Sequence, residues 1–273
     1  MGAQAFEHLQ QARGPSSFMD SAIQQICDLA MARNARLLVD AEQQAVQPGI
    51  EAWSLRYQRY CNSRTPGRAI FYSTYQAYLR STPVTLARHL EVARKEGYTL
   101  GIKMVRGAYL KTEARDLIWA TKEETDACYD GVVEAVLTRQ YNQMLQPEGE
   151  KSTQLPPVNL IIATHNRDSV QKAHALRLEQ RAHGQDHGVD LSYAQLQGMA
   201  DEVSCELTQG FEEAEKETDL SEKPNVYKLL TWGSVKECMG FLLRRAIENT
   251  EAVGRTKQSQ EAMWKEFRRR VLG

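Results

Sequence analysis

Apolar and polar positions alternate along the chain in two recurring patterns. Short apolar runs predict strands, and they cover residues 36–42, 69–75, 100–105, 158–165, 189–196 and 225–232. Apolar residues at three- and four-residue spacing predict helices, and these cover 20–33, 82–97, 116–145, 168–182, 234–250 and 257–272. Strands that alternate with helices in this way are typical of an α/β protein with a parallel sheet. The chain is therefore expected to form one domain over residues 1–273.

Turn-forming and polar segments interrupt the pattern at a few places. Thr82 and Pro83 are expected to open a helix, with a cap and a proline at its first position, and Gly97 is expected to end it. The stretches 146–157 and 211–224 are expected to be surface insertions, the second of them acidic. Residues 1–19 and 257–273 are expected to be peripheral to the domain.

Composition excludes several classes of protein. The 273 residues include 34 Lys and Arg against 35 Asp and Glu, so nucleic acid is not an expected partner. No apolar run approaches the roughly 20 residues that a membrane-spanning helix needs. Five scattered cysteines without a CxxC pair argue against a disulfide framework or a zinc site and favour a reducing compartment. His183 and His187 have the spacing of a metal pair, but Gly184 lies between them, so no metal is expected.

Polar residues recur where successive predicted strands end. These strand-end residues are Asp40 and Glu42, Gln76, Lys103 with Arg106–Tyr109, Thr164–Asn166, Gln195–Met199, and Trp232 with Gly233. In parallel α/β folds the carboxyl ends of the strands carry the chemistry. The pattern therefore predicts a ligand-lined mouth at one end of the strands, although each residue also has an ordinary interpretation as a turn or helix cap.

Lys103 is the hardest of these residues to treat as ordinary surface. Its neighbours Ile102, Met104 and Val105 are apolar, so its side chain is expected to face inward, where a cation needs a partner. Asp40 could supply that partner in a structural ion pair, and an anionic ligand is the functional alternative. Gly107 would allow a backbone to approach a ligand closely, or it is an ordinary turn glycine.

The helix predicted over 234–250 carries two adjacent arginines. Arg244 has the i,i+4 spacing to Glu248 of an exposed ion pair. Adjacent residues span about 100° of a helix, so at least one of Arg244 and Arg245 is expected near the apolar face. Arginine there suits bidentate capture of a carboxylate.

Six motifs in order give the chain a family resemblance. It resembles the proline dehydrogenases, especially the fungal ones, over about residues 20–256. The motifs are LLVDAEQQAVQPGI (37–50), STYQAYLRSTP (73–83), IKMVRGAYL (102–110), ATHNRDS (163–169), QLQGMAD (195–201) and WGSVKECMGFLLRRAIENTEAV (232–253).

The resemblance implies a flavoenzyme on a distorted (β/α)8 TIM-like barrel, with FAD over the carboxyl ends of the strands. Members oxidise L-proline to 1-pyrroline-5-carboxylate and pass electrons to quinone. By motif, the catalytic positions are Asp40 and Lys103; the cofactor positions are Ala41, Gln76, Arg106, Gly107, Ala108, Thr164 and His165; and the substrate positions are Tyr109, Leu196, Leu229, Arg244 and Arg245.

The chain departs from the family pattern in two respects. The family motif before the last helix begins with tyrosine, whereas LLTWG (229–233) has Leu229 there, which predicts altered affinity and a different cyclic imino acid such as 4-hydroxyproline. Only about six βα units are visible, so the barrel is expected to be incomplete and to bind FAD weakly. Two alternatives therefore accompany the proline dehydrogenase interpretation: a hydroxyproline dehydrogenase, and a truncated, non-catalytic homologue that acts as a binding partner.

Location follows only from the family, whose members imply a mitochondrial protein. The first 20 residues show no transit or signal peptide. The basic carboxyl end MWKEFRRRVLG could touch the inner membrane, where quinone resides, although a solvated chain end is the simpler interpretation.

Overall fold

The computed structural model describes residues 3–148, 154–185, 187–214 and 224–248, together with positions 264, 267, 268 and 271. The chain forms two compact units. Unit 1 contains Met1–Thr164 and Asp168–Leu191, and unit 2 contains His165–Arg167 and Ser192–Gly273. Each unit is described by itself below.

Strands and helices alternate as the sequence predicts. The elements are α1 (Ala3–Gln10), α2 (Ser17–Ala32), β1 (Leu37–Val39), α3 (Gln47–Asn62), β2 (Phe71–Gln76), α4 (Thr82–Glu96), β3 (Leu100–Val105), the 3-10 turn η1 (Arg115–Leu117), α5 (Lys122–Thr138), β4 (Val158–Ala163), α6 (Arg167–Ala182), β5 (Asp190–Leu196), α7 (Asp201–Ala214), β6 (Asn225–Leu229) and α8 (Val235–Glu248). The strand order follows the chain order, and every strand pair given by the described residues is parallel. The predicted α/β class and the six strands are confirmed.

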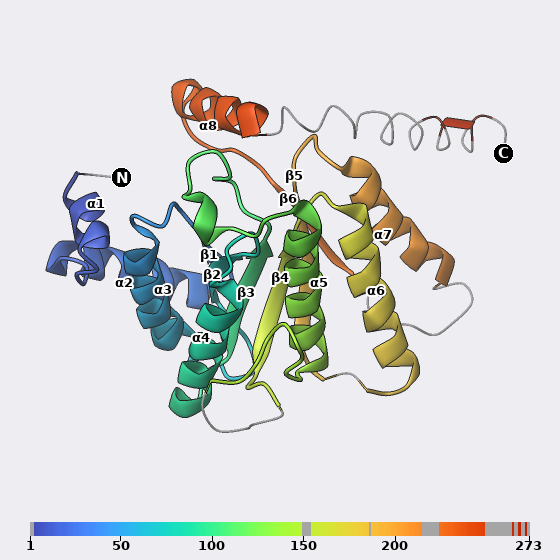
Figure 1. Ribbon diagram of the computed structural model, residues 1–273, viewed down its shortest axis with the longest axis horizontal. Helices are drawn as coiled ribbons and strands as arrows, with labels where there is room; N and C mark the ends of the chain where they lie inside the picture. The colour runs from blue at the N-terminus through green and yellow to red at the C-terminus, as the bar shows by residue number, and fades with distance from the viewer. Residues whose placement is uncertain are drawn as a thin grey trace. The chain divides into compact units, whose positions relative to one another are not determined.

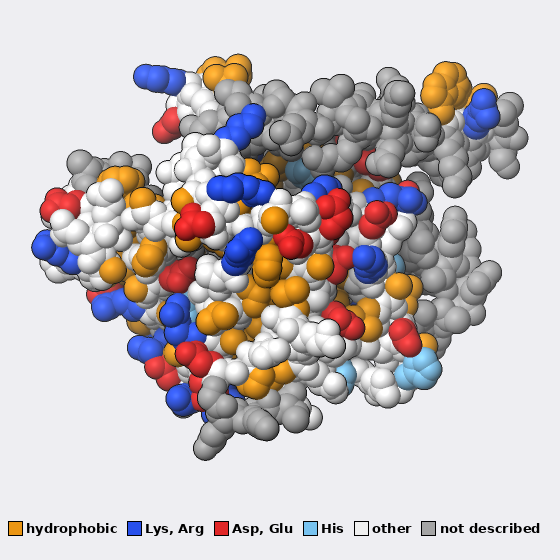
Figure 2. Space-filling model, in the orientation of Figure 1, with side chains coloured by type: hydrophobic (Ala, Val, Ile, Leu, Met, Phe, Trp, Pro, Cys, Tyr) orange, Lys and Arg blue, Asp and Glu red, His pale blue; other side chains and the backbone are white. Residues whose placement is uncertain are grey.

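The core of unit 1 is built on β2, β3 and β4, which are buried along most of their length. Figure 1 shows α4 and α5 lying along the same face of β3 and β4. Both strands, LGIKMV and VNLIIA, are rich in apolar residues, and each carries one polar residue, Lys103 and Asn159. On the face seen in Figure 2, basic and acidic side chains are intermixed over α4 and α5, in keeping with the near-zero net charge.

A buried asparagine closes the amino end of the strands in unit 1. Asn62, the last residue of α3, is fully buried. Its side-chain oxygen accepts hydrogen bonds from the backbone N–H groups of Ile70 (2.9 Å) and Phe71 (3.0 Å). Its amide nitrogen donates to the carbonyls of Phe71 (3.0 Å) and Thr99 (2.9 Å). One side chain thus satisfies main-chain groups where β2 and β3 begin.

Two further amides continue this network. Gln58 accepts from the N–H of Gly101 (2.8 Å) and donates to the Ser73 hydroxyl (2.7 Å). Asn159 accepts from the N–H of Ala69 (2.6 Å). Gln58 and Asn159 are fully buried, so the amino ends of β2, β3 and β4 are joined by uncharged groups shielded from water.

The helix predicted over 116–145 is shorter than expected. A capping box in which the Thr121 and Glu124 side chains bond each other's backbone N–H starts α5 at Lys122. Residues Arg115–Leu117 form a separate 3-10 turn, and Arg139 ends α5 in a left-handed conformation. The prediction was wrong at both ends because it read a turn and the chain beyond Arg139 as helix.

Several other details differ from the sequence prediction. Helices α1, α3 and α7 were not predicted, and α7 takes up 211–214 of the supposed insertion. Thr82 does not cap α4, because its hydroxyl donates to the Gln76 carbonyl (2.5 Å), whereas Gly97 ends α4 in the expected left-handed conformation. The insertion at 146–157 and the helix at 257–272 lie partly or mostly outside the described residues, and the positions described in the latter are helical.

Candidate active site

The inward-facing cation predicted from the sequence lies on β3. Lys103 alternates with the fully buried Ile102 and Met104, and its side chain is 14% exposed. Its Nζ lies 2.5 Å from Oδ1 of Asp40, in the loop that follows β1. The Asp40 side chain is 71% exposed. The ion pair that the sequence suggested is therefore present, and Asp40 pairs with this cation rather than capping α3, whose cap position is Val46.

Glu42 connects three neighbouring elements at this end of the strands. Its carboxylate accepts a hydrogen bond from the Tyr109 hydroxyl at 2.6 Å. Its carbonyl accepts from Nε2 of Gln76 at 3.1 Å, and its N–H donates to Oε1 of Gln47 at 2.8 Å. The predicted cofactor residue Gln76 and the predicted substrate residue Tyr109 are thus both held by Glu42, which the sequence marked only as a strand-end residue. Ala41, which precedes Glu42, is half-buried.

Gly107 has a steric reason to be glycine. Its φ of 130° is one that other residues rarely adopt, and a Cβ there would lie 2.1 Å from the Tyr78 ring. Tyr78 also donates its backbone N–H to the Arg106 carbonyl at 2.7 Å. The loop after β3, including the half-buried Ala108, thus lies tightly against the residues that follow β2.

Arg106 is directed into unit 1 by a set of protein partners. Its guanidinium donates to Asp126 (2.7 Å), to the Thr164 hydroxyl (2.7 Å) and to the Ser169 hydroxyl (2.8 Å). It also lies over the Tyr129 ring, 4.4 Å from its centre. Burial alone would raise the pKa of Asp126, but hydrogen bonds from Lys122 and Arg106 lower it below its ordinary value. A cofactor role for Arg106 stays a prediction. Because its guanidinium is bonded to these protein groups, the backbone of Arg106 is the part that could contact a cofactor.

Unit 2 brings three of its predicted residues together. Leu196 at the end of β5 is in register with Leu229 at the end of β6. Nε2 of His165 accepts the backbone N–H of Leu196 at 3.1 Å, which leaves the ring proton on Nδ1. The Leu229 side chain is half exposed.

The two arginines of α8 also belong to unit 2. The Arg245 guanidinium lies over the Phe241 ring at 5.2 Å. The side chain of Arg244 lies outside the described residues, so its predicted role stays a prediction.

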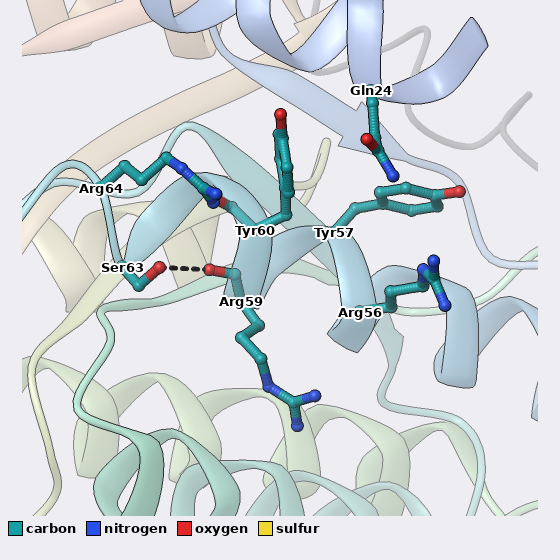
Figure 3. A pocket seen from close by; sticks show the side chains of 7 residues that line it. All are labelled: Gln24, Arg56, Tyr57, Arg59, Tyr60, Ser63 and Arg64. Atoms are coloured by element: carbon teal, nitrogen blue, oxygen red, sulfur yellow. Dashed lines mark hydrogen bonds between the residues drawn. The ribbon is translucent and has the colours of Figure 1, made fainter. Parts of the chain in front are cut away.

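A surface pocket of unit 1 lies at the other end of the strands, between α2 and the last turns of α3 (Figure 3). Three arginines line it, and each has a partner. Arg56 pairs with Asp20 at 2.7 Å, Arg59 with Glu96, and Arg64 lies 4.1 Å from the centre of the Tyr60 ring. Because two of these cations pair with carboxylates and the third lies against an aromatic ring, this pocket is a weaker candidate for the site than the strand ends.

The described part of the chain lacks two kinds of feature. No group of His, Cys, Asp and Glu side chains among those residues could hold a metal ion. None of the helices there is long and apolar enough to cross a membrane.

Comparison with known proteins decides the family. A model of the proline dehydrogenase family matches residues 2–258. The chain belongs to the proline dehydrogenase family. It is 32% identical to mitochondrial proline dehydrogenase 1 of Caenorhabditis elegans, over 90% of this chain and 37% of that protein. The human mitochondrial proline dehydrogenase 1 is 33% identical over 86% of this chain and 36% of its own length.

Other relatives differ in the substrate that they are named for. Hydroxyproline dehydrogenase of Bos taurus is 32% identical over 93% of this chain and 51% of its own length. The chain thus spans about a third to a half of the length of these family members.

Solved structures confirm the fold. A proline utilization A (PutA) variant of Bradyrhizobium japonicum matches 89% of this chain and 22% of its own with a TM-score of 0.60 at 21% identity. The PutA of Bdellovibrio bacteriovorus inactivated by N-propargylglycine matches 85% of this chain and 22% of its own with a TM-score of 0.58 at 20% identity. The six parallel strands fit part of a TIM-like barrel, as predicted.

Proposed function

We propose that this chain carries out the FAD-dependent oxidation of L-proline to 1-pyrroline-5-carboxylate, in proline catabolism. The observation that supports it most is the Lys103–Asp40 pair. A nearly buried cation lies on an inward strand position, and its carboxylate partner remains open to solvent at the carboxyl ends of parallel strands. That is where α/β barrels carry their chemistry.

The residues of unit 1 fit a flavin by their donor chemistry. Lys103, Gln76 and Thr164 offer an ammonium, an amide and a hydroxyl from or next to β3, β2 and β4. Such donors suit the carbonyl and nitrogen acceptors of a flavin ring, and a fixed cation stabilises negative charge on it. With Ala41, Gly107, Ala108 and the Arg106 backbone, these residues would hold FAD, which when bound would supply the hydride acceptor. The cofactor role of His165, in unit 2, stays a prediction from the family motif.

The chain's own residues have three tasks in this proposal. Arg244 and Arg245 orient the substrate by its carboxylate, which converts positioning into rate. Tyr109 and Leu196 are the further positions that the family motif assigns to the substrate. Oδ1 of Asp40 is occupied by Lys103, so the other carboxylate oxygen can hold the substrate ammonium and receive its proton before oxidation.

A related cyclic imino acid is the second candidate, and Leu229 favours it. The family tyrosine is replaced here by a leucine in register with Leu196, and a hydroxyproline dehydrogenase is among the relatives. Leu229→Tyr is expected to change the ratio of proline to 4-hydroxyproline oxidation several-fold, since a single polar contact contributes about 1 kcal/mol. Steady-state rates with both substrates measure it, and an unchanged ratio would remove Leu229 from specificity.

Quinone as electron acceptor, a mitochondrial location and contact with the inner membrane complete the proposal. Several relatives are named as mitochondrial. Residues 263–273, the candidate for membrane contact, lie mostly outside the described residues.

A reconstitution experiment tests the function directly. The purified chain is incubated with FAD, freed of unbound flavin and reduced anaerobically with L-proline or 4-hydroxyproline. Loss of flavin absorbance with L-proline, followed by reoxidation with a soluble quinone, is the expected result. A flavin-loaded chain that neither substrate reduces would contradict the proposal, and a folded chain that binds no flavin would favour the non-catalytic homologue.

A further inference from the structure

Two loops are tied together at the carboxyl ends of the strands in unit 1. One follows β1 and the other follows β3, with β2 between them. The Gln43 side chain donates to the Thr112 hydroxyl at 3.0 Å. The Gln44 N–H donates to the Glu113 carboxylate at 2.8 Å. With the bond from Tyr109 to Glu42, three consecutive residues of the first loop contact the second.

The Tyr109 ring is fixed at both of its ends. Its body packs against the buried cluster of Tyr78, Leu79 and Ile118. Its hydroxyl donates to the Glu42 carboxylate at 2.6 Å, which is a charge-assisted hydrogen bond. The Tyr109 carbonyl in turn accepts the N–H groups of Thr112 (3.0 Å) and Glu113 (2.9 Å). The orientation of this side chain is therefore coupled to the conformation of the loop.

We propose that Glu42 is a positioning residue, whose carboxylate holds Tyr109 in the orientation that receives the substrate. The inference rests on the proposed function, in which Tyr109 lines the substrate side. Glu42 itself acts through Tyr109 and is not a catalytic residue.

Different atoms of Glu42 serve different neighbours, and this makes the idea testable. Gln76 binds the Glu42 carbonyl and Gln47 binds its N–H, so both contacts survive any change of the side chain. Among the hydrogen bonds between described residues, the one from Tyr109 is the only one that uses the Glu42 carboxylate. A side-chain substitution should therefore release Tyr109 and leave Gln76 in place.

The kinetic test compares Glu42→Ala, Glu42→Gln, Tyr109→Phe and the double variant Glu42→Ala/Tyr109→Phe. Loss of a hydrogen bond to a charged group should raise KM for L-proline roughly tenfold in Glu42→Ala, with kcat changed by less than about twofold. Glu42→Gln keeps an acceptor and should recover part of this loss. The double variant should be no worse than the worse single variant, since both remove one contact. Glu96→Ala, which breaks the pair with Arg59, is the matched control and should leave both constants unchanged.

Amide hydrogen exchange supplies a readout that needs no activity. The N–H groups of Thr112 and Glu113 should exchange faster in Glu42→Ala than in the wild type. In the Glu96→Ala control their exchange rates should be unchanged. Unchanged exchange together with an unchanged KM would overturn the proposal, as would additive effects in the double variant. If the wild-type chain fails to oxidise proline, the proposed function falls, and exchange alone then decides whether Glu42 holds the Tyr109 loop.

Discussion

The two ends of the strands in unit 1 are both polar, but in different ways. At the amino end, the fully buried amides of Gln58, Asn62 and Asn159 bond mainly to backbone groups. At the carboxyl end, the contacts join charged side chains that water partly reaches, as between Lys103 and Asp40.

This difference separates stability from chemistry. An uncharged amide can be buried with all its hydrogen bonds made and costs little to dehydrate, whereas an ion pair gains little net stability when it is buried. Neutral groups therefore suit the amino end of the strands, which we call the closed end. Charged groups that can change partners suit the carboxyl end, which we call the open end. The three predictions that follow test this division.

The largest expected effect is at the closed end. Asn62→Ala leaves the N–H groups of Ile70 and Phe71 without their side-chain acceptor. The free energy of unfolding should fall by roughly 4 kcal/mol, from about 1–3 kcal/mol per buried unsatisfied group. Denaturant unfolding measures this. Gln43→Ala, which removes an exposed amide at the open end, should change it by less than about 0.5 kcal/mol. Equal losses of unfolding free energy in the two variants would contradict the proposed difference between the two ends of the strands.

The second prediction is that the loss of stability in acid arises mainly at His89, outside the open end. Burial, with the nearby charge of Arg88, lowers the pKa of the His89 imidazole to about 4. Its Nδ1 lies 2.9 Å from the Tyr75 hydroxyl. The unfolded chain, with an ordinary histidine pKa near 6.5, binds this proton more readily. Stability is therefore complete above about pH 6.5 and is lost as the pH falls towards 4, by up to about 3 kcal/mol.

Unfolding curves at several pH values measure that slope, and His89→Gln should flatten it. Burial also lowers the pKa of His174, so a smaller slope should remain in the variant. An unchanged slope in His89→Gln would assign the acid sensitivity to other groups, including those of the open end.

The third prediction, with the smallest of the three main effects on stability, concerns the Lys103–Asp40 pair. Lys103→Met should change the unfolding free energy by less than about 1 kcal/mol, because the Asp40 carboxylate left behind is largely hydrated. Flavin reduction by L-proline should slow by roughly 100-fold, the scale for loss of one electrostatic contact at a reacting centre. Denaturant unfolding and anaerobic flavin bleaching measure the two effects. A loss of several kcal/mol with normal bleaching would make the pair structural.

The sequence predicted β3 at its observed bounds because an apolar run there is preceded by a turn at Gly97 and followed by Arg106 and Gly107. It also suggested Asp40 as the partner of Lys103, since a cation in such a run needs one. Helix α3 was not predicted because its buried face carries polar side chains, including Gln58 and Asn62. A pattern of apolar spacing cannot reveal a helix that buries amides.

The fine structure of the candidate site depended on contacts between residues far apart in sequence. Arg106 reaches Asp126, Thr164 and Ser169, which no local motif links to it. Likewise Glu42 and Tyr109 are 67 positions apart. These residues become neighbours only because the parallel strands bring their carboxyl ends to one edge of the sheet.

The unequal exposure of Lys103 and Asp40 has a consequence for ligand entry. The ammonium gives up most of its hydration shell when the chain folds, whereas the carboxylate keeps most of its own. An anionic group of a ligand that reaches Nζ therefore binds a cation that is already largely dehydrated, so little further water has to leave the lysine.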